Sequence, residues 1–409
     1  MIIGGMLMTT PPQGAVRLAD WGLIRAQGAD TVAFLQGQLT QDVSALADHT
    51  ARLAGFCSAK GRLQASFVLW RADDAATPGA GLAATETAAA QAAAAATSPT
   101  AVPTIDLACS ADLLAATLRR LSMFVLRAKC KLSDVSAQVA LYGLAGDSAT
   151  HWLNATAADP APTAAWGVQL RGVARAIRLP DSQPAAGNPA QPRYLLAQPA
   201  ALPAPDLPAL SSDDWAWLEV HSGVARITAA TVDAFVPQMV NLDLVGGVNF
   251  QKGCYPGQEV VARSQYRGTL KRRALVFDSA APLAAGQDVF HSADLGQPAG
   301  RVVLAAARPG GGSSALVEIK LAALDSGSLH ASNLPATHLP AGSLPASHHG
   351  VAQDMAEARG TELDAGELVR GALPYDIPAM AATSATSATS ATSATPATPA
   401  TPATPAEQG

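Results

Sequence analysis

Two segments of the chain carry apolar residues at the spacing of an amphipathic helix. In segment 110–125 leucines recur three and four positions apart, and Ser110 stands where a helix-capping residue is expected. Segment 211–223 opens with Ser211 and Asp214 at capping-box spacing and closes on a glycine. We therefore predict a helix in each segment.

Other segments alternate apolar and polar residues, or form short apolar runs bounded by turns, as strands do. Segment 55–73 has the pattern of two strands joined by a Lys-Gly turn, and 138–146 and 193–199 have the pattern of further strands. After Gly268, short strands separated by Gly and Pro turns predict a small antiparallel barrel. These strands are 274–279, 288–291, 300–307 and 314–320. The pattern thus predicts an α+β body followed by an all-β end.

Three segments have a biased composition with few large apolar side chains that could pack in a hydrophobic core. Segment 73–103 is rich in Ala and Thr, segment 326–350 is rich in Pro, Ser and Gly, and from Ala381 onward the chain repeats TSA and TPA triplets. Alanines form no apolar stripe that could dock, and the triplets bury nothing that could offset their ordering entropy. We expect all three segments to be unstructured.

The bulk composition excludes several classes of protein. The 409 residues carry a net charge of −5, so no global positive field attracts nucleic acid or an anionic membrane. The four cysteines form no C-x-x-C pair, which argues against a zinc ribbon, a thioredoxin-like site and a ferredoxin-type cluster, and which fits a reducing compartment. The chain start is a poor signal peptide, and no apolar run is long enough to span a bilayer. We expect a cytoplasmic protein with no resident metal.

The most constrained segment is the tight turn KGCYPGQE, which runs from Lys252 to Glu259. Its glycines and its proline favour a rigid loop that holds Cys254 in a defined direction. Lys252 lies two residues before the sulfur and is placed to favour the thiolate, the reactive form of cysteine. Gln258 and Glu259 add an amide and a carboxylate that suit a flat heterocycle with N–H donors. The alternative is a purely structural turn, because cysteine is often buried.

This turn resembles the K-G-C-[YF]-x-G-Q-E signature of the YgfZ family, folate-binding proteins related to the T-protein (aminomethyltransferase) of the glycine cleavage system. Three further segments are similar to parts of that family: FLQGQLTQDV at 34–43, CSAKGRL at 57–63 and LPYDIP at 373–378. The resemblance spans roughly residues 15–378, with two of the biased segments as insertions.

The resemblance implies three domains around a central channel: two α+β domains and a C-terminal antiparallel β-barrel. The expected limits are 15–130 for the first domain (with 73–103 inserted), 131–268 for the second, 269–378 for the barrel (with 326–350 inserted) and 379–409 for a disordered tail. The cysteine motif belongs to the second of these domains.

The resemblance also implies tetrahydrofolate as the cofactor, bound in that channel. By local match, the two tryptophans that the family associates with folate fall on Trp21 and Trp215, and an indole face can stack on a pterin or aminobenzoyl ring. Gln258 and Glu259 are the other expected folate contacts. Trp215 equally fits a structural position in the core, and Trp217 on the same helix serves as an internal control.

One position departs from the family pattern. Relatives often carry Glu-Ala-Gly where this chain has His221-Ser222-Gly223. A neutral imidazole offers one acceptor nitrogen, whereas a carboxylate offers two oxygens. Two outcomes stay open: folate binds more weakly, or Glu219 or Glu259 replaces the missing acid.

Two functions follow from the resemblance. In the first, the protein uses tetrahydrofolate to support assembly or repair of iron–sulfur clusters in other enzymes, and so affects tRNA modification indirectly. Cys254 would act as the working thiolate, with Lys252 tuning its pKa and iron–sulfur enzymes or cluster-assembly proteins as transient partners. In the second, the protein transfers a one-carbon (aminomethyl) unit, for which no residue securely matches the required acid. The first is preferred, which makes the protein an accessory factor rather than a stand-alone enzyme.

A basic run stands out in this acidic chain. It could contact a folate polyglutamate tail, an RNA backbone or an acidic partner, or it could be a solvated strand face. Strong direct binding of nucleic acid is not expected. The run consists of Arg263, Arg267, Lys271, Arg272 and Arg273.

Overall fold

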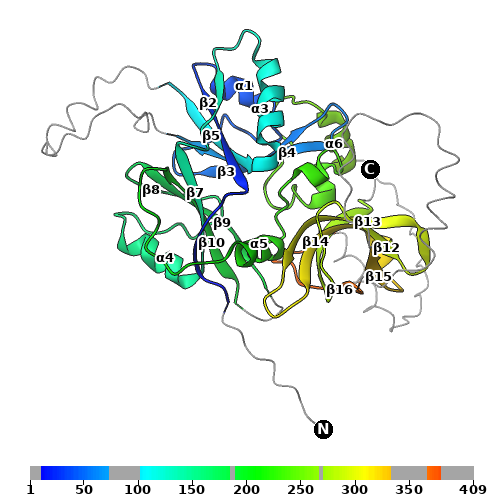
Figure 1. The fold of residues 1–409 in the computed structure, drawn as a ribbon. Helices are drawn as coiled ribbons and strands as arrows, with labels where there is room; N and C mark the ends of the chain where they lie inside the picture. The colour runs from blue at the N-terminus through cyan, green and yellow to red at the C-terminus, as the bar shows by residue number, and fades with distance from the viewer. Residues whose placement is uncertain (1–10, 73–101, 185–188, 267–269, 333–365, 379–409) are drawn as a thin grey trace, which may run out of the picture. The chain divides into compact units, whose positions relative to one another are not determined.

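The computed structural model describes residues 11–72, 102–184, 189–266, 270–332 and 366–378. The chain divides into a large unit that ends at Pro374 and a short unit that begins at Tyr375. The described part of the large unit contains three antiparallel sheets with helices (Figure 1). Among the helices of the described residues, none combines the length and the apolarity needed to cross a bilayer. The expected tail and most of both insertions lie outside the described residues.

The first sheet has the strand order β3-β4-β5-β2-β6, and each neighbouring pair is antiparallel. The strand pair predicted in segment 55–73 is confirmed as β3 and β4, although β3 begins earlier. Gly61 in the turn between them has a φ of +69°, a conformation that favours glycine. The strands are β2 (Trp21–Gln27), β3 (Ala51–Cys57), β4 (Leu63–Arg71), β5 (Thr104–Ser110) and β6 (Lys131–Asp134).

Helix α3 (Ala111–Val125) packs on this sheet against β2 and β5, and the short helix α1 (Thr31–Gln36) adds to the same core (Figure 1). The predicted helix of segment 110–125 is thus confirmed. Ser110 does occupy the N-cap position, but its side chain makes no capping bond. Its hydroxyl instead accepts a hydrogen bond from Arg226 Nη1 at 3.1 Å, so the predicted capping interaction is wrong.

The second sheet has the order β1-β7-β10-β9-β8, again antiparallel throughout. Segments 138–146 and 193–199 are confirmed as strands. The first strand of the chain, β1, joins this second sheet, whereas β6 joins the first, so the chain crosses between the sheets more than once. The elements are β1 (Gly14–Arg17), β7 (Val139–Ala145), α4 (Gly146–Ala155), β8 (Val168–Arg171), β9 (Ala174–Ser182) and β10 (Gln191–Pro199).

The third sheet contains the four strands predicted after Gly268 and has the order β15-β12-β13-β14-β11-β16. A single antiparallel bridge between His330 and Glu367 links the β15 edge to the segment that carries β16. Closure into a complete barrel stays a prediction, as do the domain limits. The elements are β11 (Arg272–Ser279), β12 (Asp288–His291), β13 (Asp294–Ala307), β14 (Ser313–Lys320), the 3-10 turn η4 (Leu321–Leu324), β15 (Leu329–Ala331) and β16 (Val369–Arg370).

The expectation that segment 326–350 is unstructured is wrong at its start. Residues 329–331 form strand β15, which pairs with β12 through Val289, Phe290 and His291. The alternation of Leu329 and Ala331, both buried, was too short a pattern to stand out among the Ser, Gly and Pro residues around it. The histidines further along this segment lie outside the described residues.

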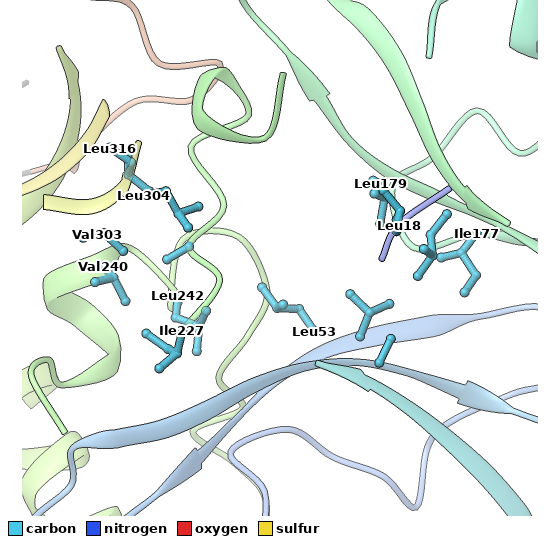
Figure 2. Close-up of a cluster of buried hydrophobic side chains, with 14 of the residues drawn as sticks. Leu18, Leu53, Ile177, Leu179, Ile227, Val240, Leu242, Val303, Leu304 and Leu316 are labelled. Atoms are coloured by element: carbon cyan, nitrogen blue, oxygen red, sulfur yellow. The ribbon is translucent and has the colours of Figure 1, made fainter. Parts of the chain in front are cut away.

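One hydrophobic cluster draws side chains from all three sheets. Figure 2 shows Leu53 of β3, with Ile177 and Leu179 of β9 to one side and Ile227 and Leu242 to the other. The same cluster continues into β13 and β14 of the third sheet through Val303, Leu304 and Leu316. The three sheets of the large unit therefore share one hydrophobic core. Burial of this apolar surface is the main favourable contribution to folding.

The segment between α5 (Ser212–His221) and the third sheet contains two 3-10 turns, η2 (Ala229–Thr231) and η3 (Pro237–Val240). The side chain of Asn241 pairs with the backbone of β11. It donates to the Ala274 carbonyl at 2.7 Å and accepts from the Ala274 N–H at 3.3 Å. Arg273 forms a buried ion pair with Asp243, with side chains only 4% and 3% exposed. This polar pairing fixes the segment to β11.

Two arginines of the basic run, Arg272 and Arg273, are paired with carboxylates. Arg273 is internal, and Arg272 is bonded to Glu318 on the neighbouring strand β14, so neither forms part of a free cationic face. Arg263 and Lys271 are exposed. Arg267 lies outside the described residues.

Candidate functional site

Helix α6 (Gln258–Tyr266) begins directly after the cysteine turn, a helix that the sequence pattern did not predict. Gly257 has a φ of +79°, and a Cβ at this position would lie 2.4 Å from the Ser58 carbonyl oxygen. A Cβ on Gly61 would likewise lie 2.8 Å from the Cβ of Val260. The two glycines therefore let the cysteine turn pack directly against the β3–β4 turn.

Lys252 anchors the cysteine turn from the inside. It is 8% exposed, and its Nζ donates to the Gln36 carbonyl and, at 2.6 Å, to the Leu39 carbonyl. The Asn249 N–H donates to the Thr40 carbonyl at 2.9 Å in the same region. The segments 34–43 and 252–259, far apart in the chain, are thus joined by hydrogen bonds.

The ammonium group of Lys252 donates hydrogen bonds to backbone carbonyls, whereas the sequence predicted that it lowers the pKa of the Cys254 thiol. Burial lowers the pKa of Lys252 to about 8, and electrostatic interactions with Asp42 and then Cys254 partly oppose that shift. A tuning role for Lys252 stays a prediction.

We expect this lysine to produce a measurable pH dependence of stability. Because the pKa of Lys252 is lower in the folded protein than its ordinary 10.5, the unfolded chain binds more protons between about pH 8 and pH 10.5. The contribution of Lys252 to stability therefore rises with pH across that window. Urea unfolding of wild type and Lys252→Met at a series of pH values should show a constant difference in free energy of unfolding below about pH 8 and an increasing one above it. A difference that is independent of pH would contradict this prediction.

The four cysteines have different environments, and all four are free thiols. Burial raises the pKa of Cys57 and of Cys109 to about 12, and it also raises the pKa of Cys130. Cys254 alone among them is exposed. Because thiols react as thiolates at accessible positions, Cys254 is the cysteine available for chemistry with another molecule.

A separate cleft, partly open to solvent, lies between strands β2, β3, β4 and β5 of the first sheet and strands β9 and β10 of the second. Its aromatic lining comes from Trp21 at the start of β2, Phe67 on β4 and Trp166. Its charged lining comes from Arg193 on β10, Glu219 on α5 and Arg226 beyond that helix. The indole N–H of Trp21 is buried and has no hydrogen-bond partner among the described residues, and the Arg226 guanidinium lies 5.1 Å from the Trp21 ring centroid.

The two predicted tryptophans have different positions. Trp21 lines the cleft, whereas Trp215 is 2% exposed in the core and packs on Gly143, where a Cβ would lie 2.6 Å from the indole. Trp215 is thus packed in the core, as its structural interpretation expects, and its predicted contact with folate stays a prediction. Trp217 donates its indole N–H to Ser314 Oγ at 3.2 Å and does not line the cleft.

Gln258 and Glu259 lie on the first turn of α6, where Gln258 is half-buried and Glu259 is exposed. Neither lines the cleft. The structure therefore brings Trp21 and Glu219 together at the cleft, and Lys252, Cys254, Gln258 and Glu259 together at the cysteine turn. Their predicted folate contacts stay predictions.

His221, the departure from the family pattern, lies outside the cleft. Its Nε2 is 3.1 Å from Ser314 Oγ, its ring packs edge-on against Trp217, and burial lowers its pKa. Glu219 does line the cleft, but its two oxygens accept hydrogen bonds from Arg226 at 3.2 and 3.1 Å. Both oxygens of the carboxylate in the cleft thus already accept a hydrogen bond.

Among the tryptophans and charged residues of the cleft, three were not singled out from the sequence: Trp166, Arg193 and Arg226. Arg193 had a detectable signal, because it opens the otherwise apolar strand pattern RYLLAQP. A charge at the end of a strand normally projects to solvent, so this position did not suggest a buried cation. Among the described residues, no group of three His, Cys, Asp or Glu side chains is placed to ligate a metal.

Comparison with curated proteins finds several relatives under one description. The chain is 34% identical over 276 residues to a tRNA-modifying protein YgfZ from Edwardsiella ictaluri, covering 64% of this chain and 70% of the relative. It is 31% identical over 276 residues to that from Pectobacterium carotovorum (64% and 71%) and 30% identical over 269 residues to that from Hamiltonella defensa (64% and 68%). No protein-family model matches the chain.

Among solved structures, the chain is similar to the glycine cleavage system aminomethyltransferase T from Bartonella henselae. The TM-score is 0.54, with 79% of this chain and 83% of that chain covered. At 14% sequence identity, this similarity establishes the aminomethyltransferase-like fold alone.

Proposed function

This chain belongs to the family of the tRNA-modifying protein YgfZ, and from that premise we propose that it binds tetrahydrofolate and supports iron–sulfur clusters in other enzymes. The proposed role is assembly or repair of those clusters, with an indirect effect on tRNA modification. The observation that carries the folate part is the cleft lined by Trp21 within an aminomethyltransferase-like fold.

The cleft residues suit a ligand that combines aromatic rings with polar edges. Trp21 and Trp166 provide indole surfaces, and stacking on an indole contributes about 0.5–1.5 kcal/mol beyond the area buried. The partnerless indole N–H of Trp21 can donate to an acceptor on such a ligand. In this proposal the sheets form the three-domain ring of the family, with the third sheet closed as a barrel.

Cys254 carries the second half of the proposal. It is exposed on a turn that Lys252 and Gly257 hold against segments 36–39 and 58–61. A cluster or a damaged cluster species is the cargo here, because one loop cysteine cannot hold a cluster that needs four thiolates. We propose transient contact with iron–sulfur enzymes or cluster-assembly proteins in the cytoplasm, without strong binding to nucleic acid.

The alternative, transfer of an aminomethyl unit, needs a carboxylate free to handle a proton at the folate. Glu219 is the carboxylate among the residues that line the cleft, and both of its oxygens are bonded to Arg226. That pairing favours the accessory role over the transferase role.

Cys254→Ala should separate the two functions. The variant should bind tetrahydrofolate as wild type does, because Cys254 does not line the cleft, but it should fail to restore iron–sulfur enzyme activity in cells that lack the protein. Tryptophan fluorescence of the purified proteins measures the first property, and enzyme assays in the complemented cells measure the second.

Trp21→Phe tests folate binding at the cleft, and Trp217→Phe is its matched control. The first should weaken binding roughly two- to tenfold, and the second should leave it unchanged, because Trp217 does not line the cleft. Full activity of Cys254→Ala in cells would remove the role proposed for the thiol. Absence of saturable quenching at millimolar tetrahydrofolate would remove the folate part.

A further inference from the structure

Arg193 on β10 is a buried cation that lines the cleft. It is 2% exposed, and its Nε and Nη2 donate to the Pro180 carbonyl at 3.2 and 3.1 Å. Within the described part of the chain, its Nη1 has no hydrogen-bond partner. The guanidinium also lies 5.3 Å from the ring centroid of Trp215. These contacts hold the side chain in place without neutralising its charge.

The carboxylates nearest to Arg193 are already paired. Asp181 is bonded to Arg178, and Glu219 is bonded to Arg226, which also holds the exposed Asp20. No described carboxylate lies within 4.0 Å of Arg193. Burial lowers the pKa of Arg193 to about 10, so the group is still charged at neutral pH. Glu219 and Asp181 attract the charge of Arg193 only from beyond ion-pair distance, so a ligand carboxylate would supply the direct partner that Arg193 lacks among the described residues.

Two side chains of the cleft offer N–H donors to a ligand. The indole N–H of Trp21 is buried and unpartnered on the side of the first sheet, and Arg193 provides N–H groups on the side of the second sheet. Both carboxylate oxygens of Glu219, which also lines the cleft, already accept hydrogen bonds from Arg226. The cleft therefore complements a ligand group that carries acceptors and negative charge rather than one that carries N–H donors.

We infer that the cleft binds a carboxylate of its ligand, held by Arg193 with the Trp21 indole N–H as a further donor. This inference rests on the proposed folate binding for the identity of the whole ligand. In tetrahydrofolate the carboxylates belong to the glutamyl part, and the N–H donors belong to the pterin edge. The glutamyl part therefore enters the cleft, and the pterin lies away from Arg193. This orientation also explains why the cleft needs no free acid at Glu219 or His221.

Ligand fragments test the orientation directly. Wild type, Arg193→Gln and Arg193→Lys are titrated by calorimetry with tetrahydrofolate, tetrahydrobiopterin, p-aminobenzoyl-glutamate and glutarate. We expect p-aminobenzoyl-glutamate and glutarate to bind wild type, and Arg193→Gln to weaken both at least about tenfold, as the loss of a charge-assisted hydrogen bond does. Arg193→Lys should retain part of the affinity, because it keeps the charge but loses the planar fork that donates to the Pro180 carbonyl.

Arg171→Gln, on β8 outside the cleft, is the matched control and should bind all four probes as wild type does. Near-ultraviolet circular dichroism establishes that each variant is folded. Tight binding of tetrahydrobiopterin with unchanged carboxylate affinity in Arg193→Gln would overturn the inference and leave folate binding intact. Failure of tetrahydrofolate alone would remove the folate proposal, whereas glutarate binding that depends on Arg193 would still support the carboxylate site. Failure of every carboxylate probe would overturn it.

Discussion

Asp243→Ala should lower the free energy of unfolding by about 3–5 kcal/mol, the largest effect that we expect from a single substitution in this protein. Asp243 accepts two hydrogen bonds from Arg273, at 2.6 and 3.0 Å, and both side chains are almost fully buried. Among the described residues, removing the carboxylate leaves the buried Arg273 guanidinium with the Gln238 carbonyl, at 2.9 Å, as its one remaining hydrogen-bond partner. Urea unfolding measures the change.

The matched control is Asp288→Ala, which removes a carboxylate from a pair at the surface. Asp288 and Arg301 are 2.9 Å apart, but their side chains are 31% and 42% exposed. Exposed pairs contribute about 0–1 kcal/mol, so this variant should unfold near the wild-type midpoint. Equal losses in the two variants would mean that burial does not determine the cost of the broken pair.

Elements whose pattern is local could be predicted from the sequence. The leucines of α3 and the serine at the start of α5 act within a few residues, and the Ser211 hydroxyl accepts from the Asp214 N–H at 3.0 Å as expected. The pairing of β1 with β7 could not be predicted, because it depends on a partner more than a hundred residues away. The capping role of Ser110 failed for the same reason, since Arg226 competes for its hydroxyl from a distant segment.

The candidate site divides in the same way. The cysteine turn was recognisable because its glycines, proline and cysteine are contiguous, and the structure adds the contact with segment 36–39 through Lys252. The cleft was recognisable only through Trp21. Its electrostatic character depends on which arginine pairs with which carboxylate across separate strands, and no spacing rule specifies that Glu219 is paired while Arg193 is not.

The two parts of the site are therefore supported in different ways. The cleft depends on the packing of two sheets, while the exposed cysteine depends on the close approach of two turns. A substitution that separates the turns should affect Cys254 without entering the cleft. Gly257 is the position at which this can be done.

Gly257→Ala should destabilise the protein by about 2 kcal/mol or more and should abolish the function that depends on Cys254. An L-residue in the left-handed conformation costs about 1–2 kcal/mol, and the new Cβ would also lie 2.4 Å from the Ser58 carbonyl oxygen and 2.6 Å from the Gly61 backbone. The turn must shift to relieve these contacts, because backbone atoms cannot rotate away as a flexible side chain can.

Gly253→Ala, next to the cysteine, is the internal comparison. A Cβ there has no heavy atom within 4 Å, and the residue is exposed, so the stability change should stay within about 0.5 kcal/mol. Urea unfolding measures stability, and the rate of Cys254 alkylation in the folded proteins reports the exposure of the thiol. If the turn is held by its contact with segment 58–61, only Gly257→Ala alters both measurements. Equal behaviour of the two variants would mean that the glycines, not that contact, set the geometry of the loop.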